Sequence, residues 1–306
     1  MYRYWKIGFL VITTMVAFIR CNNQPVVYRG DTASSGTIHI SVDESFKPVI
    51  DSQIKVFESS FPQAKIIAHY KPEAECLKDL LVDSIRMVIV TRPLLKVEEQ
   101  RLKDTLRFIP VQGKMAFDAV TVIVNPANKD SLLDRSDLRS ILNGTSGYKF
   151  RPVMDGRTAT STVRFAIDSI LAGDKLSNEV TAADSSTGVI DYVSKNKDAI
   201  GFIGVSWIGN NDDPVQLSFQ NKVTIASIKC EICPNEAYVK PYQANIATRR
   251  YPLVRGLHYI LKENYEGLGS GFANFLIYER GQLIFRRAYL WPAKMAFEVR
   301  NAGIDE

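Results

Sequence analysis

An alternation of strand-like and helix-like segments after residue 36 constrains the fold of this 306-residue chain most strongly. The apolar patterning predicts three strands, at Thr37–Ser41, Ala64–Tyr70 and Arg86–Thr91. The third is an almost continuous apolar run, as is typical of a parallel strand buried on both faces. Apolar residues at helical spacing predict helices between the strands, at residues 46–57 and 74–82. This βαβαβ order is the unit of an open parallel sheet, so the expected fold class is α/β.

A second series of elements begins at Asp118. Buried strands are expected at Ala119–Val124 and Ala199–Val205. Helices are expected at Leu132–Leu142 with a C-cap at Asn143–Gly144, at Val163–Leu171, at Val189–Val193, at Leu253–Leu261, and from Phe272 to about Tyr289 with a break near Gly281. Two α/β lobes follow from this order. Lobe one is expected to comprise residues 37–115 and 245–306, and lobe two residues 116–244.

The N-terminal segment has the pattern of an export signal. Arg3 and Lys6 precede an apolar run that is too short to span a membrane, and Cys21 stands at its end. Residues 1–21 therefore resemble a bacterial lipoprotein signal in which Cys21 is lipidated, although Arg20 stands where a small residue is usual. Ordinary cleavage, an uncleaved anchor and a buried first strand remain alternatives. The expected location is the periplasm or cell envelope, with the protein anchored to the membrane.

Residues 22–36 are rich in Asn, Thr, Ser and Gly and lack apolar periodicity, which predicts a flexible tether. The whole chain has 38 Lys and Arg against 33 Asp and Glu, and removal of residues 1–21 would leave a net charge of +2. This balance argues against nucleic-acid or membrane-surface binding.

The cysteines and histidines do not predict a metal site. Cys230 and Cys233 form a single Cys-x-x-Cys pair without a second pair, and the three histidines are scattered along the sequence. In an oxidising compartment, the pair is expected to form a small disulfide or to remain as two thiols. We expect no metal and no cofactor.

Three polar segments follow expected strands, where open parallel sheets bind their ligands. They are Ser41–Ser45, Thr91–Arg92 and Thr160–Thr162. Hydroxyls, free backbone amides at helix starts and one guanidinium suit a small tetrahedral anion. Each segment also has a simpler interpretation, as a helix cap or as a solvated surface charge. The binding hypothesis rests on their convergence at one crevice.

Six blocks resemble those of one family, in the family's order: Asp118–Pro126, Leu138–Gly144, Thr160–Phe165, Ala199–Gly204, Tyr251–Leu253 and Phe275–Pro292. That family is the phosphate-binding component of phosphate ABC importers, within the type II periplasmic binding proteins, and specifically a lipoprotein branch common in Bacteroidetes. The resemblance implies a two-lobed fold with a ligand cleft between the lobes. It also implies a role in capturing phosphate or a similar oxyanion for an ABC permease.

The same resemblance implies a set of ligand contacts. Ser45 and Phe46 would contribute from the first loop, Arg92 would lie near the second contact, and Ser161 and Thr162 would hold the anion. The chain departs from the family at Asp43 and Glu44, where small hydroxyl residues are usual, and in a phosphate loop without glycines.

The two acids have two interpretations. A carboxylate at Asp43 or Glu44 can accept the proton of hydrogen phosphate and would repel sulfate, which has no proton. Alternatively, the acids indicate a ligand with a positive group.

Two other functions are alternatives to a binding protein. An enzyme is not expected, because residues 204–209 lack the spacing of a nucleophile elbow and residues 267–271 do not follow a buried strand, as a dinucleotide loop would. We therefore expect no catalytic residues. The second is a ligand-free signalling or scaffold lipoprotein that retains the fold.

Overall fold

The computed structural model describes residues 30–156 and 158–294, and its residues from Thr32 onward form one compact unit. Cys21, the predicted signal segment and residues 22–29 of the predicted tether lie outside the described residues. The end of the predicted tether is ordered, because Thr32 and Ser35 pair with each other. None of the helices in the described ranges combines the length and hydropathy that a membrane span requires.

The strands form one large sheet and one small sheet. Their bounds are β1 Gly36–Asp43, β2 Ala64–Lys71, β3 Ile85–Val90, β4 Val111–Val124, β5 Leu132–Leu133, β6 Arg151–Met154, β7 Thr181–Ala182, β8 Ala199–Gly204, β9 Thr224–Ile225, β10 Ser227–Lys229, β11 Tyr238–Val239, β12 Val254–Leu261 and β13 Trp291–Pro292. The path through the large sheet is β2-β1-β3-β12-β4-β8-β6-β7, and the small sheet has the order β11-β10-β5.

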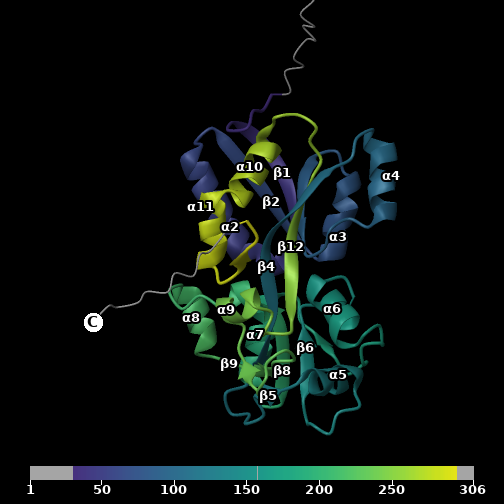
Figure 1. The fold of residues 1–306 in the computed structure, drawn as a ribbon, viewed down its shortest axis with the longest axis vertical. Helices are drawn as coiled ribbons and strands as arrows, with labels where there is room; N and C mark the ends of the chain where they lie inside the picture. The colour runs from purple at the N-terminus through teal and green to yellow at the C-terminus, as the bar shows by residue number, and fades with distance from the viewer. Residues whose placement is uncertain (1–29, 157, 295–306) are drawn as a thin grey trace, which may run out of the picture. The chain divides into compact units, whose positions relative to one another are not determined.

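The helices alternate with these strands (Figure 1). Their bounds are α2 Lys47–Ser60, α3 Glu73–Lys78, α4 Lys96–Leu106, α5 Arg135–Asn143, α6 Ser161–Phe165, α7 Ser186–Lys195, α8 Pro214–Gln220, α9 Gln243–Ala247, α10 Leu268–Ile277 and α11 Glu279–Arg287. Short 3-10 turns occur at Glu44–Phe46, Asp79–Leu81 and Val205–Trp207, and a π-helical turn, Ala166–Ile170, continues α6.

Strand β4 links two parts of the large sheet. Its residues 111–119 pair antiparallel with β12, and its residues 120–124 pair antiparallel with β8. We call β2, β1, β3, β12 and residues 111–119 the first half-sheet. The second half-sheet consists of residues 120–124, β8, β6 and β7. Strands β1, β2 and β3 are parallel to one another, as are β6, β7 and β8.

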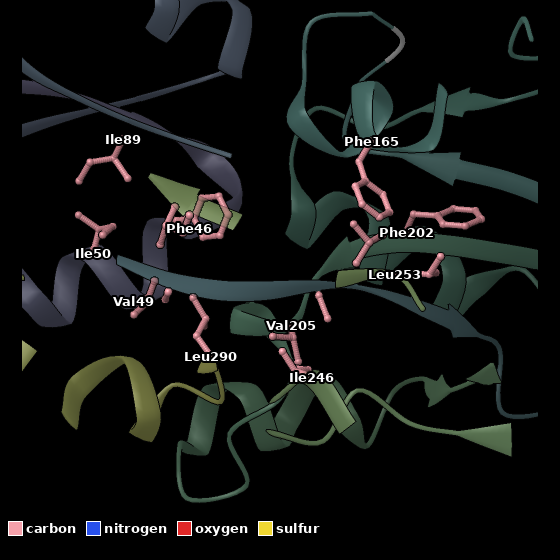
Figure 2. Close-up of a cluster of buried hydrophobic side chains, with 14 of the residues drawn as sticks. Phe46, Val49, Ile50, Ile89, Phe165, Phe202, Val205, Ile246, Leu253 and Leu290 are labelled. Atoms are coloured by element: carbon pink, nitrogen blue, oxygen red, sulfur yellow. The ribbon is translucent and has the colours of Figure 1, made fainter. Parts of the chain in front are cut away.

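Alternating side chains of the first half-sheet enter two layers of core, as expected for strands covered on both faces. In β3, Met87 and Ile89 join the main cluster with α2, whereas Val88 and Val90 pack with Leu80 on the side of α3 and α4. The main cluster continues into the second half-sheet: Figure 2 shows Phe46 and Ile50 on one side of it and Phe165 and Phe202 on the other.

Most of the expected elements are confirmed, including the three strands and two helices of the first series. The C-cap of α5 is also confirmed, because Gly144 has φ 79° and its N–H bonds the Ser140 carbonyl. Cys230 and Cys233 form a disulfide, which is one of the two expected alternatives. The α/β fold class is confirmed. The exact division into lobes at residues 115 and 245 stays a prediction.

The expected helix at Leu253–Leu261 is wrong, because this segment is strand β12. Burial alternates along its first half: Arg255, Leu257 and Tyr259 point inward and the residues between them are half-buried. This is the two-residue period of a strand and not the spacing of a helix. Two helix bounds also differ. Helix α5 begins at Arg135 behind the Asp134 cap, and the break in the last helix falls at Tyr278 instead of Gly281.

Candidate functional site

Polar side chains gather where strands of both half-sheets end. Asp43 is the last residue of β1, Thr91 follows β3, Asp155 follows β6, and Ser206 lies just beyond β8. All four are buried. Strands that are parallel within each half-sheet present their carboxyl ends on one edge, so this position is the one expected for a ligand.

Asp155 is the acceptor for hydroxyl groups from both half-sheets. The Thr160 hydroxyl donates to its Oδ1 at 2.8 Å, and the Thr162 hydroxyl donates to its Oδ2 at 3.1 Å. The Ser45 hydroxyl, from the first half-sheet side, lies 3.4 Å from the same Oδ2 and 3.3 Å from the Ser161 hydroxyl. Burial raises the pKa of Asp155, and the Thr160 hydroxyl opposes this rise. These contacts bring the two half-sheets together at one polar cluster.

Arg255 supplies the buried cation of this cluster. It faces Asp118 across the β12–β4 pairing, and its Nε donates to the Asp118 carboxylate at 2.7 Å. Its Nη1 donates to the Ser161 hydroxyl at 3.0 Å, and its guanidinium lies 5.2 Å from the centre of the Phe46 ring. Because the Arg255 and Asp118 side chains are only 3% and 0% exposed, solvent screens this pair little.

Three buried atoms in the cluster have no hydrogen-bond partner among the described residues. They are Oδ2 of Asp43, Oδ1 of Asp118 and Nη2 of Arg255. The other oxygen of Asp43 accepts the Ser45 backbone N–H at 3.1 Å. Burial raises the pKa of Asp43 to about 7, even though the positive charge of Arg255 acts to lower it. A buried polar group without a partner costs roughly 1–3 kcal/mol, so Oδ2 of Asp43 and Nη2 of Arg255 favour a ligand that can satisfy both.

A second ion pair lies beside this cluster. Nε of Arg164, on α6, donates to Glu73 at 2.6 Å, and its Nη2 donates to the Thr91 hydroxyl at 2.6 Å. Burial acts to raise the pKa of Glu73, but the Arg164 guanidinium and the Thr91 hydroxyl outweigh it, and the net shift is downward. Glu73 is therefore a buried carboxylate that is already paired.

The structure brings together five of the seven residues that the sequence predicted as ligand contacts: Asp43, Ser45, Phe46, Ser161 and Thr162. Glu44 lies next to them and is half-buried, where its carboxylate accepts the Ser186 hydroxyl at 2.9 Å. Burial raises the pKa of Glu44, and the Ser186 hydroxyl opposes this rise.

Arg92 is not brought to the cluster. Its guanidinium makes two hydrogen bonds of 2.7 Å to Glu98, and its side chain lines a surface pocket of about 310 Å³ between α3 and α4. The reason is local: Pro93 follows Arg92 directly, and Glu98, in the first turn of α4, binds the guanidinium.

Sequence reasoning did not predict Arg255, Asp118 or Asp155 as site residues. Arg255 and Asp118 lie in apolar strands, where a buried ionisable residue needs a partner. Their position in the sequence could therefore have predicted a buried ion pair. Asp155 directly follows β6, a short strand that the sequence patterning missed. In the part of the chain that the structure describes, no group of three or more His, Cys, Asp or Glu side chains could hold a metal ion.

Comparisons with known proteins give a matching family model and similar sequences. Residues 28–280 match the family model described as the PBP superfamily domain. The phosphate-binding protein PstS of Staphylococcus aureus (strain bovine RF122 / ET3-1) is 22% identical over 258 residues, which cover 79% of this chain and 74% of the relative.

Solved structures show the same fold. A Clostridium perfringens protein described as a phosphate ABC transporter substrate-binding protein, with bound phosphate, superposes with a TM-score of 0.70 at 19% identity, covering 85% of this chain and all of that one. An ABC-type phosphate transport receptor from Vibrio cholerae gives a TM-score of 0.62 at 19% identity, covering 84% and 100%. The expected two-lobed binding-protein fold and the expected resemblance to phosphate-binding components of ABC importers are both confirmed, whereas the assignment to a lipoprotein branch stays a prediction.

Proposed function

Because this chain belongs to the PBP superfamily, we propose that it is an extracytoplasmic substrate-binding protein that captures phosphate, or a closely similar oxyanion, for an ABC importer. The curated and solved proteins that it resembles are named for phosphate binding and phosphate transport. We further propose that Cys21 carries a lipid anchor, that an ABC permease is the partner, and that the chain performs no catalysis.

One observation carries this proposal: Arg255 and Asp43 each have a buried polar atom without a partner at the point where both half-sheets meet. The Arg255 guanidinium offers a charge-assisted donor for an anionic oxygen, the strongest kind of hydrogen bond in such a site. Arg255 thus takes the cationic role that the sequence suggested for Arg92, whose guanidinium is bound to Glu98.

Asp43 favours an oxyanion that bears a proton. Once Asp43 has lost the proton that burial retains up to about pH 7, a phosphate hydroxyl can donate to its Oδ2 while another phosphate oxygen accepts from Arg255 Nη2. Sulfate has no proton at neutral pH, so it would leave the ionised Asp43 carboxylate without a donor and would be repelled by its negative charge. Selectivity for phosphate over sulfate follows from this mismatch.

A ligand-free scaffold lipoprotein is the alternative function. Its support is that Asp155 already accepts the Thr160 and Thr162 hydroxyls, so those groups have an acceptor within the chain itself. A scaffold, however, would not require the unpartnered donor of Arg255.

Isothermal titration of the purified protein with phosphate and with sulfate separates the two functions. A binding protein for phosphate gives a saturable heat with a dissociation constant of about 1 µM or below, a free energy of roughly −8 kcal/mol or more favourable. Sulfate should bind much more weakly. Absence of binding by either anion, with the fold intact, would favour the scaffold.

A further inference from the structure

A short row of contacts joins the two half-sheets beside the ligand cluster. Glu73 is the first residue of α3, which packs on β1 and β3, whereas Arg164 lies on α6, beside the second half-sheet. The Arg164 guanidinium donates to Glu73 Oε2 at 2.6 Å, to Glu73 Oε1 at 3.4 Å and to the Thr91 hydroxyl at 2.6 Å. Next to this pair, the Ala74 backbone N–H donates to the Ala159 carbonyl at 3.0 Å.

Helix α6 contributes residues both to the anion cluster and to the contacts between the half-sheets. Ser161 and Thr162, at its first turn, belong to the anion cluster, and Arg164 follows them on the same short helix. On the first half-sheet side, Thr91 holds the Glu73 carboxylate in place. Glu73 accepts both the backbone N–H and the hydroxyl of Thr91, at 2.8 and 2.5 Å. A movement that separates the half-sheets would therefore break the Arg164 contacts and displace the ligand-facing hydroxyls together.

Because the Glu73–Arg164 pair is partly buried, it stabilises the contact between the half-sheets more than a surface ion pair would. The Glu73 side chain is 2% exposed and the Arg164 side chain 33%. Arg164 is also paired with Asp168 on its own side at 3.0 Å, so its guanidinium is held in place before it reaches Glu73. If the half-sheets separated, the Glu73 carboxylate would keep Thr91 but lose its cation.

We propose that the Glu73–Arg164 pair is a positioning pair that holds the two half-sheets together over the bound anion and so sets the rate of anion release. The pair does this without touching the anion. The part of this inference that concerns release rests on the proposed function, whereas the part that concerns closure does not.

The experiment compares wild type with Arg164→Gln, which removes the charge but keeps a polar side chain and leaves the Glu73–Thr91 contacts in place. Arg139→Gln is the matched control, because Arg139 forms an exposed ion pair with Asp174 that involves only the second half-sheet side. Closure is measured without ligand, by the distance between spin labels at Lys103→Cys and Lys175→Cys, two exposed positions on opposite sides of the pair, in a Cys21→Ser background. Release is measured by stopped-flow dissociation of phosphate.

Arg164→Gln should shift the ligand-free label distances to longer values and speed phosphate release about tenfold, the loss expected for one charge-assisted hydrogen bond. The ratio of phosphate to sulfate affinity should not change, since the pair does not contact the anion. Arg139→Gln should leave all three measurements unchanged, and Arg164→Lys should restore part of the closure.

Label distances in Arg164→Gln identical to those of wild type would overturn the inference, as would an unchanged release rate in a variant that binds phosphate. If phosphate fails to bind to the wild type, the proposed function fails. The label distances then test closure by themselves.

Discussion

Replacement of Arg255 by glutamine is the most informative perturbation of the proposed site. The Arg255 guanidinium donates to Asp118 at 2.7 Å and to Ser161 at 3.0 Å, and its Nη2 is the donor that we assign to the anion. A charge-assisted hydrogen bond contributes about 1.5–3 kcal/mol, which corresponds to roughly a tenfold to hundredfold change in affinity. Arg255→Gln should therefore weaken phosphate binding by at least one decade in isothermal titration.

The single substitution has a structural cost that must be separated from the binding effect. It leaves Asp118 buried without its cation, and breaking a buried ion pair from one side costs about 3–5 kcal/mol of stability. The double variant Arg255→Gln/Asp118→Asn removes both charges together and should recover much of the stability but not the affinity. Urea unfolding measures the first quantity and titration the second.

Arg92→Gln is the matched control, because it also removes one guanidinium near the end of a strand but breaks only the partly exposed pair with Glu98. It should change phosphate affinity by less than about threefold, since pairs of this kind contribute roughly 0–1 kcal/mol. The reasoning is refuted if the folded double variant binds phosphate as tightly as wild type, or if Arg92→Gln proves the more damaging change.

Four further predictions concern three other residues. Thr162→Val removes a neutral hydroxyl donor that faces Asp155, so phosphate affinity should fall by a few-fold, less than for Arg255→Gln, in the same titration. Asp43→Asn should narrow the gap between phosphate and sulfate affinity; an unchanged ratio would exclude Asp43 as the acceptor of the ligand's proton. In the ligand-free wild type, the Asp43 carboxyl keeps its proton up to about pH 7, whereas its ordinary pKa is 3.8. Its contribution to the free energy of unfolding therefore falls as pH rises from about 4 to 7, by ~1.4 kcal/mol per pH unit at most. Urea unfolding of Asp43→Asn at several pH values should lack this contribution of Asp43 to the pH dependence of stability. Cys21→Ser should move the protein from the membrane fraction to the soluble fraction; a variant that stays membrane-bound would show that the anchor is not a lipid on Cys21.

The fold was predictable where local pattern and tertiary burial agree. The strand at Arg86–Thr91 and the cap at Asn143–Gly144 are determined by nearby residues, and both are present in the structure. Prediction failed at Leu253–Leu261, where the partners of the segment decide its conformation. This segment pairs with β3 and β4, more than a hundred residues away in sequence, and such pairing outweighs a local helical pattern.

The site was predictable at strand ends but not within the strands. Asp43, Ser45 and Ser161 follow from the rule that ligands lie beyond the carboxyl ends of strands. Arg255 and Asp118 lie inside paired strands, and their contact depends on the β12–β4 register, which the sequence does not state. Arg92 satisfied the same rule as Asp43, but Glu98 lies within reach and binds its guanidinium.

A crystal structure of the protein grown with phosphate tests the central claim most directly. We predict an oxyanion between the two half-sheets, with one oxygen on Arg255 Nη2 and a phosphate hydroxyl on Asp43 Oδ2, close to the Ser45 and Ser161 hydroxyls. Phosphate bound at Arg92 instead, or a cluster that retains its present hydrogen bonds and holds no anion at saturating phosphate, would contradict the account.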